Sequence, residues 1–128
     1  MDYVLDTNVA IHLRDGDPTI TAKTDTLQGA TYLSIITRVE LEGGVHASQT
    51  DAERRRARLD ILLRAIPVLA FDDAAADAYA AIIQKNGYSR RKVMDRMIAG
   101  QALAREATLV TMNPNDFRDV PGLEILVW

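Results

Sequence analysis

The sequence contains no cysteine and only two histidines, His12 and His46. Without cysteine the chain can form neither a disulfide framework nor a thiolate metal site. Two histidines are too few for a histidine-rich zinc site. Any metal ion would therefore be held mainly by oxygen, which favours a hard cation such as Mg²⁺ or Mn²⁺.

Long apolar runs and a strong net charge are also missing. No run of about 18 apolar residues is available to span a membrane, and the first ten residues, MDYVLDTNVA, lack the basic start and apolar stretch of a signal peptide. We therefore expect a cytoplasmic protein with no membrane partner. The net charge of −3 gives no overall basic field for nucleic acid, although local patches can still attract a phosphate backbone.

The composition is that of an ordinary globular protein. With 128 residues, 48% of them hydrophobic and 26% charged, the chain fits one domain spanning residues 1–128. Short apolar runs alternate with amphipathic helical stretches, a pattern typical of a parallel sheet covered by helices. The expected strands are residues 3–5, 32–34, 68–71, 108–111 and 124–127, and the expected helices begin near residues 6, 18, 37, 50, 72 and 93.

Four acidic residues lie where these elements begin or end. Asp6 directly follows the first strand, Asp95 opens the last helix and Asp116 follows the strand 108–111. Asp6 and Asp95 could simply favour helix starts, and Asp116 could simply form a turn. Taken one at a time, these positions do not require a functional explanation.

Glu40 lies on the helix expected to begin near Thr37. Helical spacing places it with Ile36 and Gly43 on an inner face and turns Glu42 away. An inward carboxylate is costly unless it is paired or bound to a metal. Alternatively, Glu40 borders the apolar stripe and its carboxylate reaches water.

Taken together, the four acids predict a metal site. If the first and fourth strands are neighbours, Asp6 and Asp116 emerge side by side at the carboxyl edge, where open parallel sheets bind ligands. The adjoining helices would bring Glu40 and Asp95 to the same place. Carboxylates so close would repel one another and some would hold protons, unless a divalent cation bound between them.

Four segments also share a recognisable order and spacing, namely Val4–Asn8, Val39–Leu41 with the following Gly43-Gly44, Asp95–Ala99, and Leu109–Phe117. In combination they resemble the signatures of PIN-domain nucleases, and most closely those of the VapC-type toxins of bacterial toxin–antitoxin pairs. The resemblance extends over nearly the whole chain and includes the ending 120–123 and the terminal Trp128.

This resemblance implies an α/β fold, a three-layer α/β/α sandwich with a five-stranded parallel sheet of order 3-2-1-4-5. It implies a Mg²⁺-dependent endoribonuclease, with Mn²⁺ as a substitute ion, that hydrolyses RNA phosphodiester bonds as the toxin of a type II pair. The implied partners are the RNA substrate, a cognate antitoxin and a second copy in a homodimer.

Carried over position by position, the resemblance makes Asp6 and Asp95 the primary metal ligands. Glu40 and Asp116 would complete the acidic site directly or through water. The polar residues expected to hydrogen-bond around it are Thr7, Thr111 and Asn113. Gly100-Gln101 departs from the small pair common in the family, which raises a question about the packing of the last helix.

Basic residues near these acids are candidates for substrate binding. Arg90, Arg91 and Lys92 precede Asp95 and could hold the RNA backbone, although a solvated loop is the alternative. Arg38 could bind phosphate or pair with a neighbouring acid. The arginines at 54–56 and 58 lie mostly on the outer face of their helix and are interpreted as a solubilising surface or part of a partner interface.

Rival functions are weaker. A phospho-receiver domain needs an aspartate after its third strand, which Asp72 or Asp73 could supply, and a lysine after its fifth strand, yet no lysine follows Lys92. A haloacid-dehalogenase-type phosphatase needs a second aspartate two residues after the first, and Asn8 stands there. A catalytically inert PIN-like binding module stays open as an alternative.

Overall fold

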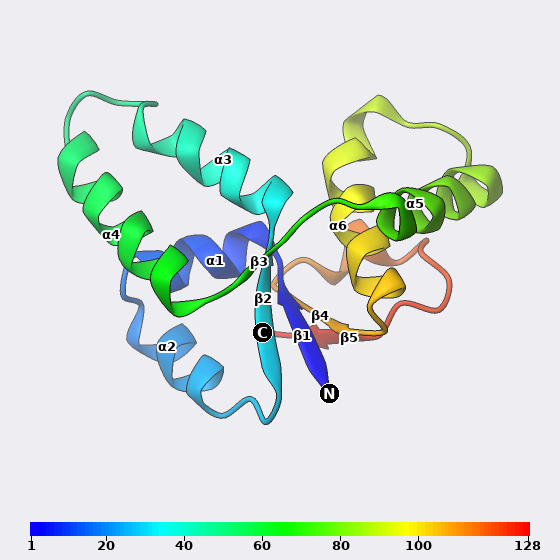
Figure 1. Ribbon diagram of the computed structural model, residues 1–128, viewed down its shortest axis with the longest axis horizontal. Coiled ribbons are helices and arrows are strands. Elements are labelled where there is room, and N and C mark those ends of the chain that lie inside the picture. Colours follow the sequence, from blue (N-terminus) through cyan, green and yellow to red (C-terminus); the bar gives the residue numbers. More distant parts are fainter.

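The computed structural model describes all 128 residues as a five-stranded parallel sheet covered by helices (Figure 1). The sheet order β3-β2-β1-β4-β5 confirms the predicted topology. The central strand β1 pairs with β2 on one side and β4 on the other, so Asp6 leaves the sheet beside the end of β4. The strands are β1 Asp2–Leu5, β2 Ala30–Ser34, β3 Val68–Leu69, β4 Thr108–Thr111 and β5 Ile125–Val127.

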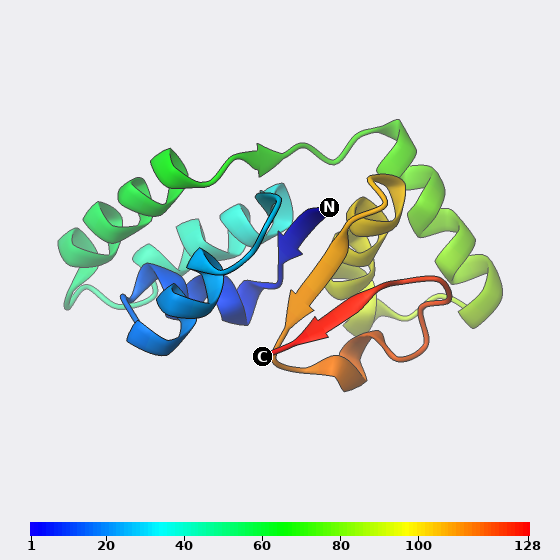
Figure 2. The same cartoon turned by 90° about the horizontal axis from the view of Figure 1, so that it is seen from below.

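The helices form the two outer layers of the predicted sandwich. Helices α1 to α4 lie on one side of the sheet, and α5 and α6 lie on the other (Figures 1 and 2). None of these helices combines the length and apolar character needed to cross a membrane. The helices are α1 Thr7–Arg14, α2 Pro18–Asp25, α3 Ile35–Val45, α4 Ala52–Ala65, α5 Asp73–Asn86 and α6 Val93–Ala104, with short 3₁₀ turns η1 Arg90–Lys92 and η2 Pro114–Phe117.

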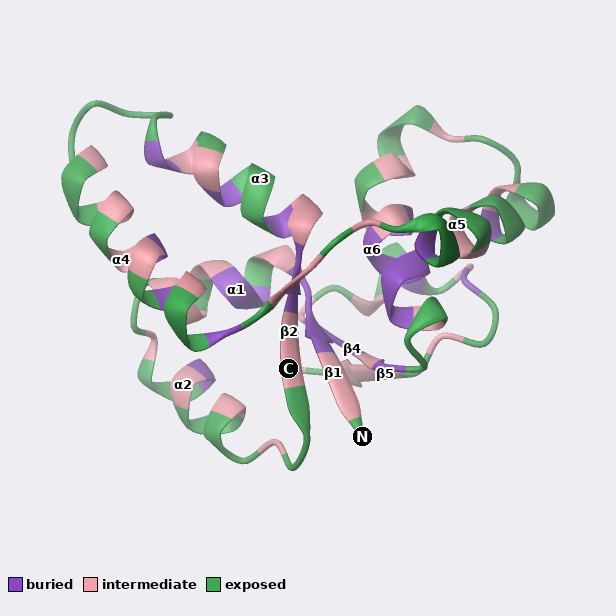
Figure 3. Cartoon of the chain, in the orientation of Figure 1, coloured by how far each residue is buried: buried purple, intermediate pink, exposed green.

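Alternation along the central strands builds a separate core on each face of the sheet. Leu5 and Val110 pack into the core beneath α1 to α4, and their neighbours Val4 and Leu109 pack into the core beneath α5 and α6. All four side chains are fully buried, and each such burial contributes about 1.5–3 kcal/mol. The buried residues are concentrated around the sheet (Figure 3). These two cores fix where the strands end, and therefore where Asp6 and Asp116 emerge.

Gly100-Gln101, the departure from the family pattern, has a clear packing role. A Cβ on Gly100 would lie 3.0 Å from the carbonyl oxygen of Ala75 and 3.2 Å from the nitrogen of Tyr79, so glycine lets α6 approach α5 closely. Gln101 is buried, and its Nε2 donates to the carbonyls of Leu69 and Ala70 at 3.0 and 3.1 Å. The pair therefore ties α6 to both α5 and the segment that follows β3.

Several predicted boundaries were wrong. Thr50 and Glu53 have the spacing of a capping box, which predicts that α4 is capped by Thr50. Asp51 occupies the cap instead, with φ of 69° and no side-chain capping bond. Helix α3 begins at Ile35 rather than near Thr37, since the hydroxyl of Ser34 accepts from the backbone of Ile36 at 2.9 Å. Strand β3 covers two residues rather than the expected four.

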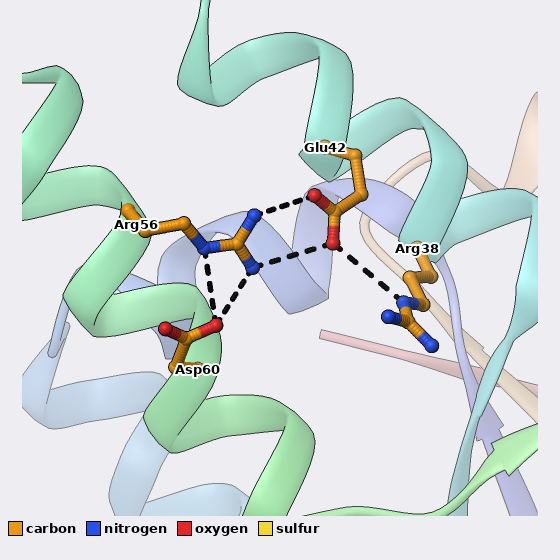
Figure 4. A network of polar contacts seen from close by, with 4 residues as sticks. All are labelled: Arg38, Glu42, Arg56 and Asp60. Atoms are coloured by element: carbon orange, nitrogen blue, oxygen red, sulfur yellow. Dashed lines mark hydrogen bonds and ion pairs between the residues drawn. The ribbon is translucent and has the colours of Figure 1, made fainter.

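The arginines of α4 are not simply a solvated outer face. Arg56 donates to Glu42 on α3 at 2.5 Å and to Asp60 at 2.7 Å, while Arg38 lies 3.6 Å from Glu42 (Figure 4). Arg55 donates to the carbonyl of Gly44 at 3.1 Å. These contacts join α3 to α4 and thereby hold the helix that carries Glu40.

Candidate active site

The structure brings the four predicted acids to the carboxyl edge of the sheet. Asp6 caps α1 directly after β1, and Asp116 lies in η2 after β4. Asp95 stands in the first turn of α6, and Glu40 lies on α3. Their charges act on one another, because the negative charges of Asp6, Asp116 and Glu40 all raise the pKa of Asp95.

Asp6 is the buried member of the group, with 5% of its surface exposed. One carboxylate oxygen accepts from the backbone of Thr7 at 2.8 Å, and the other accepts from the Thr111 hydroxyl at 2.9 Å. Burial raises the pKa of Asp6, the two hydrogen bonds oppose that rise, and the charge of Asp116 adds to it. Both oxygens are thus held in a fixed orientation at the end of β1.

Asp95, in the first turn of α6, has a strongly raised pKa. Burial is the largest cause, followed by the charges of Asp6, Asp116 and Glu40, and the pKa rises from 3.8 to about 6. Lys92 opposes the rise. A pKa of about 6 means that burial, with a further contribution from the charges of the other acids, destabilises the ionised form of Asp95.

Glu40 does not lie on the inner face of α3 as predicted. The buried stripe of this helix is Thr37, Leu41 and Val45, and Glu40 is exposed. It nevertheless turns toward the acidic group, because the Thr7 hydroxyl donates to its carboxylate at 3.0 Å. The side chain therefore reaches the site from the solvent side.

The three predicted polar residues, Thr7, Thr111 and Asn113, make different contacts around the acids. Thr7 joins the region of Asp6 to Glu40, and its hydroxyl lies 2.9 Å from that of Thr37. Thr111 is fully buried and orients Asp6. Asn113 acts through its backbone, whose N–H donates to the Thr111 hydroxyl at 3.0 Å, while its side chain is exposed and makes no hydrogen bond to the protein.

The donor set suits a hard divalent cation, although no three acidic or histidine side chains already converge at metal-ligand distance. Every candidate ligand is a carboxylate oxygen, which is the ligand type Mg²⁺ prefers. The charges of Asp6, Asp116 and Glu40 add to the effect of burial on the pKa of Asp95, and a cation bound among these acids would relieve their repulsion. The residues present therefore fit the metal that the resemblance implies.

The family of this chain follows from its similarity to known proteins. A family model described as the PIN domain matches residues 3–123. The chain belongs to the PIN-domain family. The resemblance identified from the sequence is confirmed.

Relatives match this PIN domain from end to end. The tRNA(fMet)-specific endonuclease VapC of Shigella flexneri is 33% identical over all of this chain and 98% of its own length. Ribonuclease VapC2 of Rickettsia felis is 29% identical over all of this chain and 98% of its own length.

Solved structures of the same type share the fold. VapBC2 from Rickettsia felis, bound to a promoter DNA fragment, matches with a TM-score of 0.88 and 26% identity over 100% of this chain and 99% of that one. DNA-bound VapBC from Salmonella typhimurium matches with a TM-score of 0.86 and 29% identity over 100% and 98% of the two chains. The three-layer fold with strand order 3-2-1-4-5 is therefore the fold of VapC-type PIN domains.

Of the predicted substrate-binding residues, the structure brings Arg91 and Lys92 of this PIN domain to the acids. Together with Ser89 they line a pocket that also contains Asp95 and Asp116. Arg90 is exposed and does not line that pocket, and Arg38 lies beside Glu42 instead. The basic segment, Arg90–Lys92, thus shares a pocket lined only by polar residues with two of the four acids, Asp95 and Asp116, while Glu40 lines a separate pocket together with Thr7.

Two residues beside the site, Arg96 and Asp119, were not predicted from the sequence. Arg96 is buried beside Asp95 with 4% of its surface exposed, and it donates to Asp119 at 3.0 Å. Asp119 also accepts from Lys92 at 3.1 Å. The available signal was Arg96 itself, a charge among Met97, Ile98 and Ala99 that needs a partner when it is buried.

Proposed function

We propose that this PIN domain is a Mg²⁺-dependent endoribonuclease that hydrolyses RNA phosphodiester bonds, and that it is the toxin of a type II toxin–antitoxin pair. The observation that carries the proposal is the placement of Asp6, Glu40, Asp95 and Asp116 around the carboxyl edge of the sheet, where burial and the charges of the other three acids raise the pKa of Asp95 to about 6. The names of the relatives, ribonucleases of the VapC type, support the same activity.

Asp6 and Asp95 would be the primary ligands of the metal, and Glu40 and Asp116 would complete its surroundings directly or through water. When bound, the ion would lower the pKa of a water molecule, orient the scissile phosphate and stabilise charge on the leaving oxygen. An all-oxygen donor set fits Mg²⁺, with Mn²⁺ as a substitute.

The surrounding residues would orient the acids and receive the proton of the attacking water. Thr7 and Thr111 hold both oxygens of Asp6. Thr7 also occupies one oxygen of the exposed Glu40, which leaves the other free to accept a proton. Asp116, which lines the polar pocket, is the alternative base. By family resemblance the products carry 5′-phosphate and 3′-hydroxyl ends.

The positive charges in the pocket would hold the RNA backbone. Arg91 and Lys92 line it together with Asp95 and Asp116, so a phosphate bound there lies next to the acids. Arg38 and Arg90 would add charge only at its margin, since neither lines the pocket.

The proposed partners are an antitoxin and a second copy of the chain. The similar solved structures are VapBC pairs, which supports a cognate antitoxin for this PIN domain. A homodimer follows from the family resemblance. A cytoplasmic location follows from the proposed substrate, which is structured cellular RNA such as transfer or ribosomal RNA.

Cleavage of transfer RNA and ribosomal RNA by purified protein, with Mg²⁺ or Mn²⁺, tests the proposal. Loss of residues that merely orient metal ligands costs 10–100-fold, so loss of a ligand in Asp95→Asn should reduce cleavage by more than about 100-fold. The matched control is Asp77→Asn, an exposed change on α5 that should leave cleavage unaltered. Equal cleavage by wild type and Asp95→Asn would overturn the proposed site, and no cleavage by wild type would favour an inert PIN-like binding module.

A further inference from the structure

Asp119 joins the parts of the chain that surround the polar pocket. Its Oδ2 accepts from Arg96 of α6 at 3.0 Å and from Lys92 of η1 at 3.1 Å. Asp119 lies three residues after Asp116, and Arg96 directly follows Asp95. One carboxylate oxygen therefore links the two segments that carry pocket acids to the end of the basic segment.

Arg96 and Asp119 also hold the chain just before the basic segment, at Asn86 and Gly87. Arg96 donates through Nη1 to the carbonyl of Gly87 at 2.8 Å. The side chain of Asn86 donates to the backbone carbonyl of Asp119 at 2.6 Å. The stretch from residue 86 to residue 92 is thus tied at both ends, and Ser89, Arg91 and Lys92 of this stretch line the pocket.

Stability alone is a poor explanation for this arrangement. Burying a charged pair costs desolvation energy that the pair recovers only when its hydrogen bonds are complete. Here Arg96 Nε and Asp119 Oδ1 are buried and have no partner within the protein. Such a pair adds little stability, but it fixes the positions of the segments that it joins. Lys92, which donates to Asp119, lines the pocket together with Asp95 and Asp116.

We propose that Asp119 and Arg96 are positioning residues that hold Lys92 and the basic segment before it against the acidic pocket, where the segment binds a phosphate of the RNA backbone. The inference rests on the proposed ribonuclease function. It adds that Asp119 and Arg96 act on RNA affinity through Lys92.

Binding of fluorescently labelled RNA, followed by anisotropy over a range of salt concentrations, tests this inference. The Asp6→Asn background keeps the RNA intact during the measurement. Asp119→Asn, which keeps the volume but removes the charge, should weaken binding by about tenfold, the value of a single charged hydrogen bond. It should also lower the slope of log affinity against log salt by about 0.7, as expected for one lost phosphate contact on single-stranded RNA.

A double-mutant cycle separates positioning from general damage to the fold. Lys92→Met changes a partly exposed side chain and should reproduce the loss of affinity and of salt slope without unfolding the protein. In the Lys92→Met background, Asp119→Asn should then have no further effect. The control is Asp2→Asn, which removes the ion pair with Arg105 at the other end of β1 and should leave binding unchanged.

The outcomes distinguish the two proposals. Unchanged affinity in Asp119→Asn, or an undiminished effect of Asp119→Asn in the Lys92→Met background, would overturn the positioning role even if wild type cleaves RNA. Intact binding by the Asp6→Asn parent together with no cleavage by wild type would overturn the proposed function alone, and the cycle would still decide the positioning role. No RNA binding by the parent would overturn both.

Discussion

Replacing Asp95 with asparagine should stabilise the metal-free protein at neutral pH. The carboxyl group has a pKa of about 6 in the fold against an ordinary 3.8, so folding disfavours its ionised form. Without solvent screening, that difference in pKa corresponds to about 3 kcal/mol of unfolding free energy. Because Asp95 is only half-buried, solvent screening reduces the expected gain to about 1–2 kcal/mol.

The pH dependence of this gain follows from the direction of the pKa change. An acid whose pKa is raised by folding lowers stability only when it is ionised, so the cost is absent below about pH 4 and complete above about pH 6. The gain of Asp95→Asn over wild type should therefore appear between these values and persist at higher pH.

Thermal unfolding in the presence of EDTA, measured at about pH 7.5 and about pH 4, checks both points. At the higher pH the Tm of Asp95→Asn should exceed that of wild type by about 3–8 °C, and at the lower pH the two should coincide. Asp77→Asn, an exposed change, should not alter Tm by more than about 2 °C at either pH. Mg²⁺ should raise the Tm of wild type and not that of Asp95→Asn. Equal Tm values at neutral pH, or a gain of the same size at both pH values, would refute the raised pKa of Asp95.

Three further substitutions test the framework by thermal or urea unfolding. Gly100→Ala should lose about 1–3 kcal/mol, because its Cβ would lie 3.0 Å from a backbone oxygen of α5, and unchanged stability would contradict the close packing of α5 and α6. Asp119→Ala should lose about 3 kcal/mol or more by leaving the buried Arg96 without its carboxylate, and a loss under about 1 kcal/mol would show that Arg96 finds another partner. Asp72→Ala should lose about 1 kcal/mol, because Asp72 caps α5 by accepting from a backbone N–H at 2.9 Å.

The sheet and its carboxyl edge could be predicted from the sequence because strand signals are short and local. The runs around Val4 and Leu109 are apolar on both faces, which is typical of strands buried between two layers of helices. The strand order came from the family resemblance, since apolar runs do not specify which strands pair. Given that order, the position of Asp6 directly after β1 was enough to place it at the site.

Two predictions were wrong because a sequence pattern did not specify the local structure, at the cap of α4 and on the buried face of α3. The Thr50-to-Glu53 spacing predicted a capping box, but Asp51 takes a left-handed conformation at the cap, which aspartate tolerates better than most residues. Glu40 was placed on an inner face because it shares a helical stripe with Ile36 and Gly43, whereas the neighbouring stripe is the buried one. The helix begins at Ile35 and buries Thr37, Leu41 and Val45 instead.

The network around Asp119 could not be predicted, because its partners are distant along the chain. Arg96 precedes Asp119 by 23 residues and Lys92 precedes it by 27. Such contacts depend on how η1, α6 and η2 pack together, and helical periodicity carries no information about them. The receiver-like alternative is also resolved only in three dimensions, where Asp72 is an exposed helix cap.

The central claim is that carboxylates from four separate segments bind one divalent ion site, and a crystal soaked in MnCl₂ tests it most directly. Anomalous diffraction should place manganese in contact with both Asp6 and Asp95, with Glu40 and Asp116 bound to it directly or through water. No peak at that position in crystals saturated with manganese, or peaks only on other surfaces, would contradict the account.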